Sequence, residues 1–202
     1  MNEDHYFSAD PEVAFKRTAV TTTVWGQKLT LTSGSGVFAQ GRLDIGTSVL
    51  FRETEPPLET GTFLDLGCGY GVIGCALALS VPKSQVWAVD VNERAVRLAN
   101  ENAVALHVSE RLTAVTPAGV PVDLGFDEIW SNPPIRIGKQ ALHRLLSAWL
   151  SRLNPGGRAV MVVGKNLGAD SLHRWLVDQG YPTARLASAK GFRVLEARQT
   201  RG

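Results

Sequence analysis

Two segments of the chain combine residue types that could hold a small ligand and orient a reacting group. Residues 65–74 read D-L-G-C-G-Y-G-V-I-G, and residues 131–134 read S-N-P-P. Glycines let the backbone approach a bound ligand closely, and a helix that follows such a turn points its free N–H groups at the ligand. Each segment follows a short apolar stretch that predicts a strand, and open α/β sheets bind ligands at the carboxyl ends of their strands. The pair predicts a ligand-binding turn that faces the side-chain amide of Asn132.

Two carboxylates accompany the glycine-rich turn. Asp65 ends the first strand, where it could order the turn and meet an amino group of the ligand. Asp90 ends the next apolar stretch about 20 residues further on, where an acid can accept hydrogen bonds from both hydroxyls of a ribose. Residues 69–74 also satisfy the G-x-G-x-x-G pattern, which would make the ligand NAD. We disfavour that alternative, because hydride transfer gives the Asn-Pro-Pro segment no role.

The Asn-Pro-Pro segment suits a reaction at a planar NH2 group, whose lone pair is delocalised into a ring or a carbonyl. If the side-chain oxygen of Asn132 and the backbone carbonyl of Pro133 accept its two hydrogens, positive charge that develops on the nitrogen is stabilised. Pro133 and Pro134 restrict the backbone, so the carbonyl is oriented before the substrate binds. An Asp at this position would still accept the amine hydrogen, so we expect Asn132→Asp to be milder than Asn132→Ala.

The rest of the chain predicts the elements that position these groups. Residues 18–31 predict a β-hairpin, and the strands and helices that follow it alternate, which predicts a parallel sheet covered on both faces. The last two strands are separated only by residues 188–191, too few for a helical crossover, so they must pair antiparallel. The expected strands cover residues 62–66, 85–90, 112–115, 126–130, 158–163, 184–187 and 192–197, and the expected helices cover 46–53, 72–80, 93–105, 139–153 and 169–179.

Length and composition limit the class of protein. A chain of 202 residues with 44% hydrophobic content can bury one substantial core and is short for two. We expect a single domain over residues 1–202, with an N-terminal hairpin and entry helix at 1–55 and the catalytic core at 56–202. No apolar run is long enough for a membrane span, and the acidic start is unlike a signal peptide. Cys68 and Cys75 fit neither a disulfide framework nor a metal site, so we expect a cytoplasmic protein without a metal.

Charge permits a nucleic-acid partner without arguing for one. The formal net charge is only +2, whereas dedicated nucleic-acid domains are usually more basic. Four basic residues follow the Asn-Pro-Pro segment and could form a local positive edge suited to phosphate. They are Arg136, Lys139, His143 and Arg144. The same residues could equally be the solvated start of a helix.

Taken in chain order, these motifs resemble the class I S-adenosylmethionine-dependent methyltransferases of the small-domain group. That group includes enzymes that methylate guanine N2 in small-subunit ribosomal RNA, together with stand-alone archaeal-type relatives. The resemblance implies a Rossmann-like α/β fold, with a seven-stranded, mostly parallel sheet, an antiparallel C-terminal strand and an N-terminal β-hairpin. It rests on residues 5–7, 36–38, 43–47, 65–74, 132–136, 138–139 and 190–195, which together span nearly the whole chain.

The resemblance also assigns roles within the site. It implies that Asn132, Pro133 and Pro134 are catalytic and that Ile135, Arg136 and Lys139 bind the substrate. Two positions depart from the family: Ile135 stands where base methyltransferases often carry an aromatic residue, and Thr116 stands where an acid often binds the adenine amine. The residues implied to bind S-adenosyl-L-methionine are Asp44, Asp65, Gly67, Cys68, Gly69, Gly71, Asp90, Val91, Thr116 and Asn132.

The function implied by the resemblance is methyl transfer to an exocyclic amine, most naturally guanine N2 of ribosomal RNA. Adenine N6 in nucleic acid and the side-chain amide of a protein glutamine present the same planar NH2 group and stay open as alternatives. A catalytically idle methyltransferase-like fold that binds RNA or assists assembly is a further alternative. The presence of Asp65, Asp90 and Asn132 together disfavours it.

Overall fold

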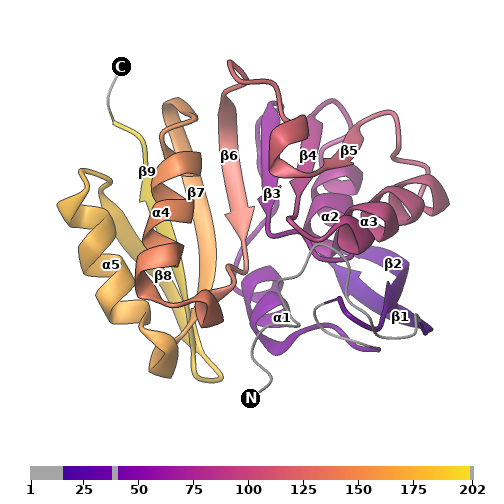
Figure 1. The fold of residues 1–202 in the computed structure, drawn as a ribbon, viewed down its shortest axis with the longest axis horizontal. Helices are drawn as coiled ribbons and strands as arrows, with labels where there is room; N and C mark the ends of the chain where they lie inside the picture. Colours follow the sequence, from indigo (N-terminus) through magenta and orange to yellow (C-terminus); the bar gives the residue numbers. More distant parts are fainter. Residues whose placement is uncertain (1–15, 38–40, 201–202) are drawn as a thin grey trace.

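The computed structural model describes residues 16–37 and 41–200, so the motif residues 5–7 and Phe38 lie outside the described part. Its main sheet has seven strands in the order β5-β4-β3-β6-β7-β9-β8 (Figure 1). β9 pairs antiparallel with both β7 and β8, and the other pairs are parallel. The predicted Rossmann-like sheet is therefore confirmed. The strands are β3 (Thr62–Leu66), β4 (Gln85–Val89), β5 (Leu112–Val115), β6 (Phe126–Ser131), β7 (Leu153–Gly164), β8 (Thr183–Ala189) and β9 (Phe192–Arg198).

The chain changes direction across the sheet between β3 and β6. From β3 it moves outward through β4 to β5, and it then returns to place β6 on the other side of β3. The register pairs Leu66 with Ser131, so the glycine turn and Asn132 leave neighbouring strands at the same edge. The helices after these two strands cover opposite faces, which opens a crevice between the strand ends.

Helices cover both faces of the sheet, as predicted. α1 (Ile45–Arg52), α2 (Val72–Ser80) and α3 (Glu93–Ala105) pack on one face, and α4 (Lys139–Leu150) and α5 (Ala169–Asp178) pack on the other (Figure 1). Successive side chains of a strand point to opposite faces. In β7, Val160 and Val162 join the core beneath α1 and α2, whereas Met161 and Val163 join the core beneath α4 and α5. A strand buried on both faces therefore reads as a continuous apolar run.

The N-terminal hairpin consists of β1 (Arg17–Val24) and β2 (Gln27–Gly34), which pair antiparallel. Its two-residue turn places both Trp25 and Gly26 at positive φ, the backbone that a tight hairpin requires. Trp25 then packs edge-on against Trp130, 5.5 Å between ring centroids. Asn102 of α3 bonds both backbone groups of Thr32 and the carbonyl of Tyr70, which ties the hairpin to the glycine turn.

Some predicted boundaries differ from the structure around β7. The helix expected at 139–153 ends at Leu150, because β7 already begins at Leu153. The sequence N-P-G-G at residues 154–157 is typical of a turn, yet it lies within this strand, which shifts register against β6. Gly157 permits the close approach, since an added Cβ would lie 2.9–3.1 Å from three backbone oxygens. β8 also runs from Thr183 to Ala189, longer than the 184–187 expected.

Candidate active site

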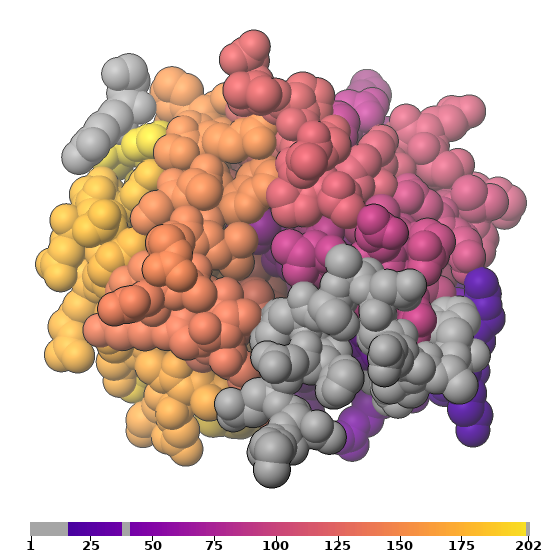
Figure 2. Space-filling view, viewed as in Figure 1, coloured from indigo at the N-terminus to yellow at the C-terminus, as the bar shows by residue number. Residues whose placement is uncertain are grey.

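A cavity of about 470 Å³ opens at the carboxyl edge of the sheet, between the ends of β3 and β6. Figure 2 shows the surface hollowed on this face, between the orange-coloured and the magenta-coloured parts of the chain. Many residues expected to form the site line this one cavity, although they come from distant parts of the sequence. They are Asp44, Gly67, Gly69, Asp90, Val91, Asn132, Pro133, Pro134, Ile135 and Arg136.

The backbone of the glycine turn adopts conformations and close contacts that residues with a side chain would not fit. Gly67, Gly69 and Gly71 all have positive φ, and a Cβ on Gly71 would lie 2.8 Å from the Cβ of Ala99 in α3. The N–H groups of Gly67 and Cys68 donate to the carbonyl of Val89 at 2.8 and 3.0 Å, which fixes the turn to the end of β4. These hydrogen bonds fix the position of the turn at the start of α2.

Asp65 lies fully buried beneath this turn. Its Oδ2 accepts a hydrogen bond from the Gly74 N–H at 2.8 Å, while its Oδ1 is buried without a hydrogen-bond partner among the described residues. Burial raises the pKa of Asp65 to about 7, the Asp90 charge adds to the rise, and the bond from Gly74 opposes it. An unpartnered carboxylate oxygen next to the turn is suited to a cationic amino group, so the contact of Asp65 with the amino end of S-adenosylmethionine stays a prediction.

Asp90 joins the end of β4 to the glycine turn. Its Oδ2 accepts from the Gly69 N–H and its Oδ1 accepts from the Asn92 N–H, both at 2.9 Å. Burial raises the pKa of the Asp90 carboxyl, and hydrogen bonds from the backbone N–H groups of Asn92, Gly69 and Val91 oppose this rise. Each carboxylate oxygen can accept more than one bond. The side chain therefore keeps the capacity to accept ribose hydroxyls from the cavity it lines.

The amide of Asn132 is oriented by two residues around the start of α1. Its Nδ2 donates to Asp44 Oδ1 at 2.7 Å and to Thr47 Oγ1 at 3.0 Å. A carboxylate can only accept, so this contact fixes which end of the amide is the NH2 group and leaves Oδ1 as the atom available to a ligand. Asp44 also caps α1 by accepting from the Thr47 N–H. Asp44, expected to contact the cofactor, does line the cavity, but its carboxylate also serves to position Asn132.

The two prolines shape the backbone after Asn132. Pro134 has φ −73° and ψ 73°, the geometry of an inverse γ-turn, and the Ile135 N–H donates to the Pro133 carbonyl at 2.8 Å. This carbonyl keeps a second lone pair for an incoming donor. Ser131 ties the segment to the neighbouring strand end, since its hydroxyl donates to the Leu66 carbonyl at 2.7 Å.

Apolar side chains form another wall of the same cavity. The residues of this wall come from β6, α4, β7 and β9 or from the segments next to these elements. They are Ile135, Leu145, Trp149, Leu167 and Phe192. An apolar wall suits a planar ring and excludes water from it. Ile135 thus keeps an apolar surface at the place where related enzymes often carry an aromatic residue.

Not all the expected residues reach the cavity. Asp65, Cys68 and Gly71 are not among the residues that line it, and Pro117 lines the cavity rather than its neighbour Thr116. Burial raises the pKa of the Cys68 thiol well above its usual value, which keeps it unreactive. Lys139 is exposed at the start of α4, outside the cavity lining.

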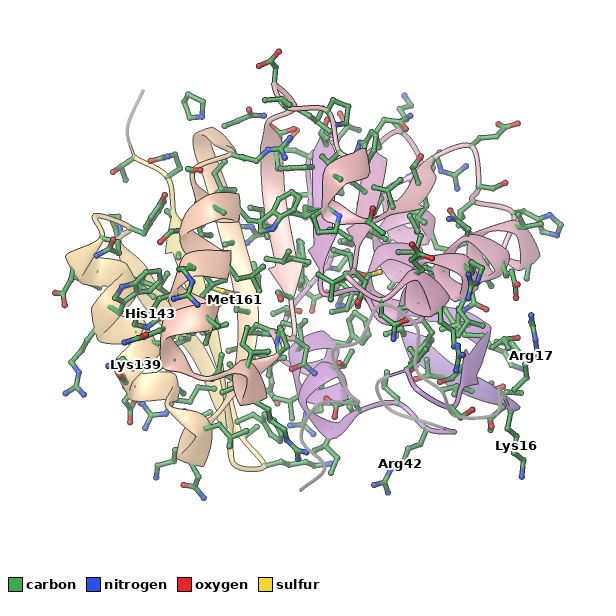
Figure 3. All side chains as sticks on the ribbon, viewed as in Figure 1. Lys16, Arg17, Arg42, Lys139, His143 and Met161 are labelled. Atoms are coloured by element: carbon green, nitrogen blue, oxygen red, sulfur yellow. The ribbon has the colours of Figure 1, made fainter. Side chains whose placement is uncertain are left out.

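His143 does not contribute to a positive edge. Its ring stacks on Trp175 of α5 with 4.0 Å between centroids, and Figure 3 shows it on α4 near Lys139. Burial and the Lys139 charge lower the pKa of His143 from its usual value, so the imidazole is neutral near pH 7. The basic edge proposed from the sequence therefore loses one of its members.

Several residues of the site were not identified from the sequence. Thr47 orients Asn132, Asn92 donates to the Gly36 carbonyl at 2.9 Å beside the cavity, and Phe192 lines the cavity from the start of β9. A signal existed for Phe192, because residues 190–195 belong to the family-like stretches, although they carried no assigned role. Asn92 had the weaker signal of a helix-capping residue two positions after Asp90.

Comparison with known proteins places this geometry in a family. The model of the methyltransferase small domain family matches residues 28–196 of the chain. The chain belongs to this family. The match confirms the resemblance found in the sequence and the predicted enzyme class, an S-adenosylmethionine-dependent methyltransferase.

Named relatives resemble this methyltransferase over different shares of their length. It is 32% identical to the Bacillus subtilis protein named "Uncharacterized protein YbxB", over 97% of this chain and 98% of that protein. It is 34% identical to ribosomal RNA small subunit methyltransferase C of Pseudomonas aeruginosa strain LESB58, over 86% of this chain and 52% of that protein. The chain thus spans about half the length of that named ribosomal RNA methyltransferase.

A solved structure shares the fold of this methyltransferase. The T. thermophilus 16S rRNA N2 methyltransferase RsmC, in complex with AdoMet and guanosine, aligns with a TM-score of 0.78 at 22% identity, over 94% of this chain and 52% of that one. Within residues 16–37 and 41–200, no helix is long and apolar enough to cross a membrane. Across the same residues, no three His, Cys, Asp or Glu side chains gather in a metal-binding group.

We expect the affinity of this methyltransferase for S-adenosylmethionine to rise as the pH rises from 6 to 7. The ionised form of Asp65 should bind the cofactor ammonium group, and with a pKa of about 7 its ionised fraction grows about fivefold over this interval. Calorimetric titrations at pH 6, 6.5 and 7 measure the effect. Asp65→Asn should weaken binding and remove the dependence, and an equal pH dependence in wild type and variant would contradict this role.

Proposed function

We propose that the chain is a cytoplasmic N-methyltransferase that transfers a methyl group from S-adenosylmethionine to guanine N2 of ribosomal RNA. The observation that carries the proposal is the orientation of Asn132, whose NH2 group is held by Asp44 and Thr47. The side-chain oxygen that remains is an acceptor, and it suits a substrate NH2 group that can only donate there. The named ribosomal RNA relatives and the guanosine bound to the T. thermophilus neighbour support a guanine in RNA.

Methyl transfer to an exocyclic amine depends more on the orientation of the substrate nitrogen than on a strong base that removes its proton. S-adenosylmethionine supplies a methyl group on a positively charged sulfur. In the transfer the substrate nitrogen would bond to the methyl carbon, the sulfur would keep the electron pair of the broken bond, and the nitrogen would then release one proton to water. The Asn132 oxygen and the Pro133 carbonyl would stabilise the positive charge that develops on this nitrogen. Because Asp44 and Thr47 already fix the amide, little reorganisation accompanies the transfer.

We also propose that residues 1–202 act as one methyltransferase domain, with the hairpin region at 1–55 as an integral part of the catalytic core at 56–202. Two contacts support this view. Trp25 of the hairpin packs against Trp130 of β6, and Asn102 bonds the backbone of Thr32. The described part of the N-terminal region therefore shares the main core and is tied to the glycine turn.

Methyl-labelled S-adenosylmethionine offered with separate pools of ribosomal RNA, transfer RNA and protein tests the proposed function. Wild type should label ribosomal RNA, and Asn132→Ala should label it far more slowly. Label confined to protein would favour a glutamine amide, which presents the same NH2 group. Absence of label in every pool, despite cofactor binding, would favour the idle RNA-binding alternative.

Arg136 and Lys139 should contribute unequally to RNA binding. Arg136 lines the cavity and Lys139 lies outside it, so Arg136→Ala should reduce the log–log salt slope of RNA affinity by about 0.7–0.9 and Lys139→Ala by less. Filter binding from about 50 to 200 mM salt measures the slopes. Lys83→Ala, an exposed lysine that precedes β4 at the opposite edge of the sheet, is the control. If Arg136→Ala and Lys83→Ala gave equal slopes, Arg136 would only be a solvated surface residue.

A further inference from the structure

A second cavity, of about 430 Å³, lies at the turn between β8 and β9. Its cationic lining residues are Lys165, Arg185, Lys190 and Arg193, and among the described residues that line it none is acidic. The net charge of the whole chain is only +2. Positive charge is therefore concentrated here far above the average for the molecule, which makes the cavity a place for an anion.

This basic cavity adjoins the active site. Phe192 lines both cavities, and Gly164 and Leu167, on either side of Lys165 in sequence, line the active cavity. The Lys165 N–H donates to the Gly191 carbonyl at 2.7 Å, so the segment after β7 and the tip of the β8–β9 turn are joined. The two cavities consequently open beside each other at the carboxyl edge of the sheet.

Arg193 is the most buried cation of the cluster. Its side chain is only 11% exposed and forms an ion pair with Asp170 through one terminal nitrogen. Its Nε is buried and has no hydrogen-bond partner among the described residues. A buried donor without a partner is uncommon in folded proteins and indicates a group that a ligand could satisfy.

Lys190 occupies a backbone position that suits another residue better. It has φ +48° and is followed by Gly191 at φ +79°, and Ala189 pairs with Phe192, so the hairpin has a two-residue turn. Such turns favour Asn or Asp before Gly, because a lysine backbone in the left-handed region is less favourable. A lysine at this tip therefore supplies positive charge to the cavity at some expense of local stability.

We propose that these four cations form a phosphate site for the RNA substrate, and we name it the hairpin-tip site (Lys165, Arg185, Lys190, Arg193). It would bind a backbone phosphate beside the nucleotide whose base enters the active cavity. An enzyme that acts on a base must hold it out of its stack, and contacts to the flanking phosphates position the strand without reading its sequence. The site lies beside the active cavity, which Arg136 also lines. This inference rests on the proposed function, since it requires an RNA substrate.

Lys190→Asn and Lys165→Ala test the hairpin-tip site, with Lys83→Ala as the control that removes one exposed charge at the opposite sheet edge. RNA affinity of the full chain is measured against salt, together with S-adenosylmethionine affinity and melting temperature. Each hairpin-tip variant should bind ribosomal RNA about three- to tenfold more weakly near 0.1 M salt, with a salt slope lower by about 0.7–0.9. Lys190→Asn should melt at the wild-type temperature or above it, because Asn suits the turn. Cofactor affinity should not change.

The outcomes separate this inference from the proposed function. If wild type methylates RNA while both hairpin-tip variants keep the affinity and salt slope of Lys83→Ala, the hairpin-tip site is wrong and the proposed function stands. If wild type neither binds nor methylates RNA but methylates protein, the proposed function falls and the inference falls with it. Weaker RNA binding by a Lys190→Asn variant of undiminished stability would support the site, since a folding defect could not explain it.

Discussion

Asn132→Ala should lower single-turnover methyl transfer by about two to three orders of magnitude, the loss typical of one oriented group that stabilises transition-state charge. S-adenosylmethionine affinity should stay within a few-fold of wild type, because the amide oxygen acts on charge that appears only as the methyl group moves. Rapid-quench assays with saturating RNA measure the chemical step, and calorimetry measures the cofactor affinity. A variant that kept full methyl transfer on the true substrate would contradict the role of Asn132.

The contact with Asp44 changes the expectation for Asn132→Asp. The sequence alone predicts a mild effect, because an Asp could still accept the amine hydrogen. In the structure the Asn132 amide nitrogen lies 2.7 Å from Asp44 Oδ1, so the substitution would place two carboxylates against each other. We now expect Asn132→Asp to be nearly as impaired as Asn132→Ala at neutral pH.

The double variant Asp44→Asn with Asn132→Asp provides the matched control. It reverses the donor and the acceptor of the same hydrogen bond, and it leaves a carboxylate oxygen directed at the substrate amine. Activity at least tenfold above that of Asn132→Asp alone would indicate that the pair works as a unit. Equal activity of the single and double variants would mean that Asp44 acts only as the cap of α1.

Asp90→Ala should weaken S-adenosylmethionine binding by about 10- to 100-fold. Loss of charge-assisted hydrogen bonds to a ribose costs about 1.5–3 kcal/mol, and the same change releases the Gly69 N–H that holds the glycine turn. Asp90→Asn keeps an acceptor for Gly69 without the charge, so its loss should be smaller. Calorimetric titration compares the three proteins.

Two results would count against the role of Asp90. Wild-type cofactor affinity in Asp90→Ala would defeat the ribose assignment. Binding of NADH that S-adenosylhomocysteine failed to displace would instead revive the dinucleotide alternative for residues 69–74, against the family to which the chain belongs.

The elements could be predicted because their sequence patterns are local. The apolar strand 62–66 before the glycine turn and the short gap between the last two strands required only the neighbouring residues. The alternation of strands and helices predicted a mostly parallel sheet, and the family resemblance implied its seven-stranded Rossmann-like form. Leu153 was predicted to end a helix, although it is the first residue of β7. This strand continues through N-P-G-G because it pairs with β6, and no local sequence pattern encodes that pairing. Tertiary contacts decided that boundary.

The site was predicted less completely, for a similar reason. Asp90 and Asn132 follow strands at recognisable spacings, so their places at the cavity could be expected. The contacts of Asn132 with Asp44 and Thr47 join residues 88 and 85 positions apart, and they exist only because α1 packs beside the end of β6. His143 was assigned to a positive edge because the sequence cannot reveal its stacking on Trp175.

The most direct test of the central claim is the chemical identity of the methylated product. Ribosomal RNA labelled by wild type with methyl-labelled S-adenosylmethionine is digested to nucleosides and analysed by mass spectrometry, with Asn132→Ala run in parallel. The orientation of Asn132 predicts that the label resides on an exocyclic amine and that the variant yields almost none, and the proposed function specifies N2-methylguanosine as the product. Label on a ribose hydroxyl, a ring carbon or a ring nitrogen would contradict the account.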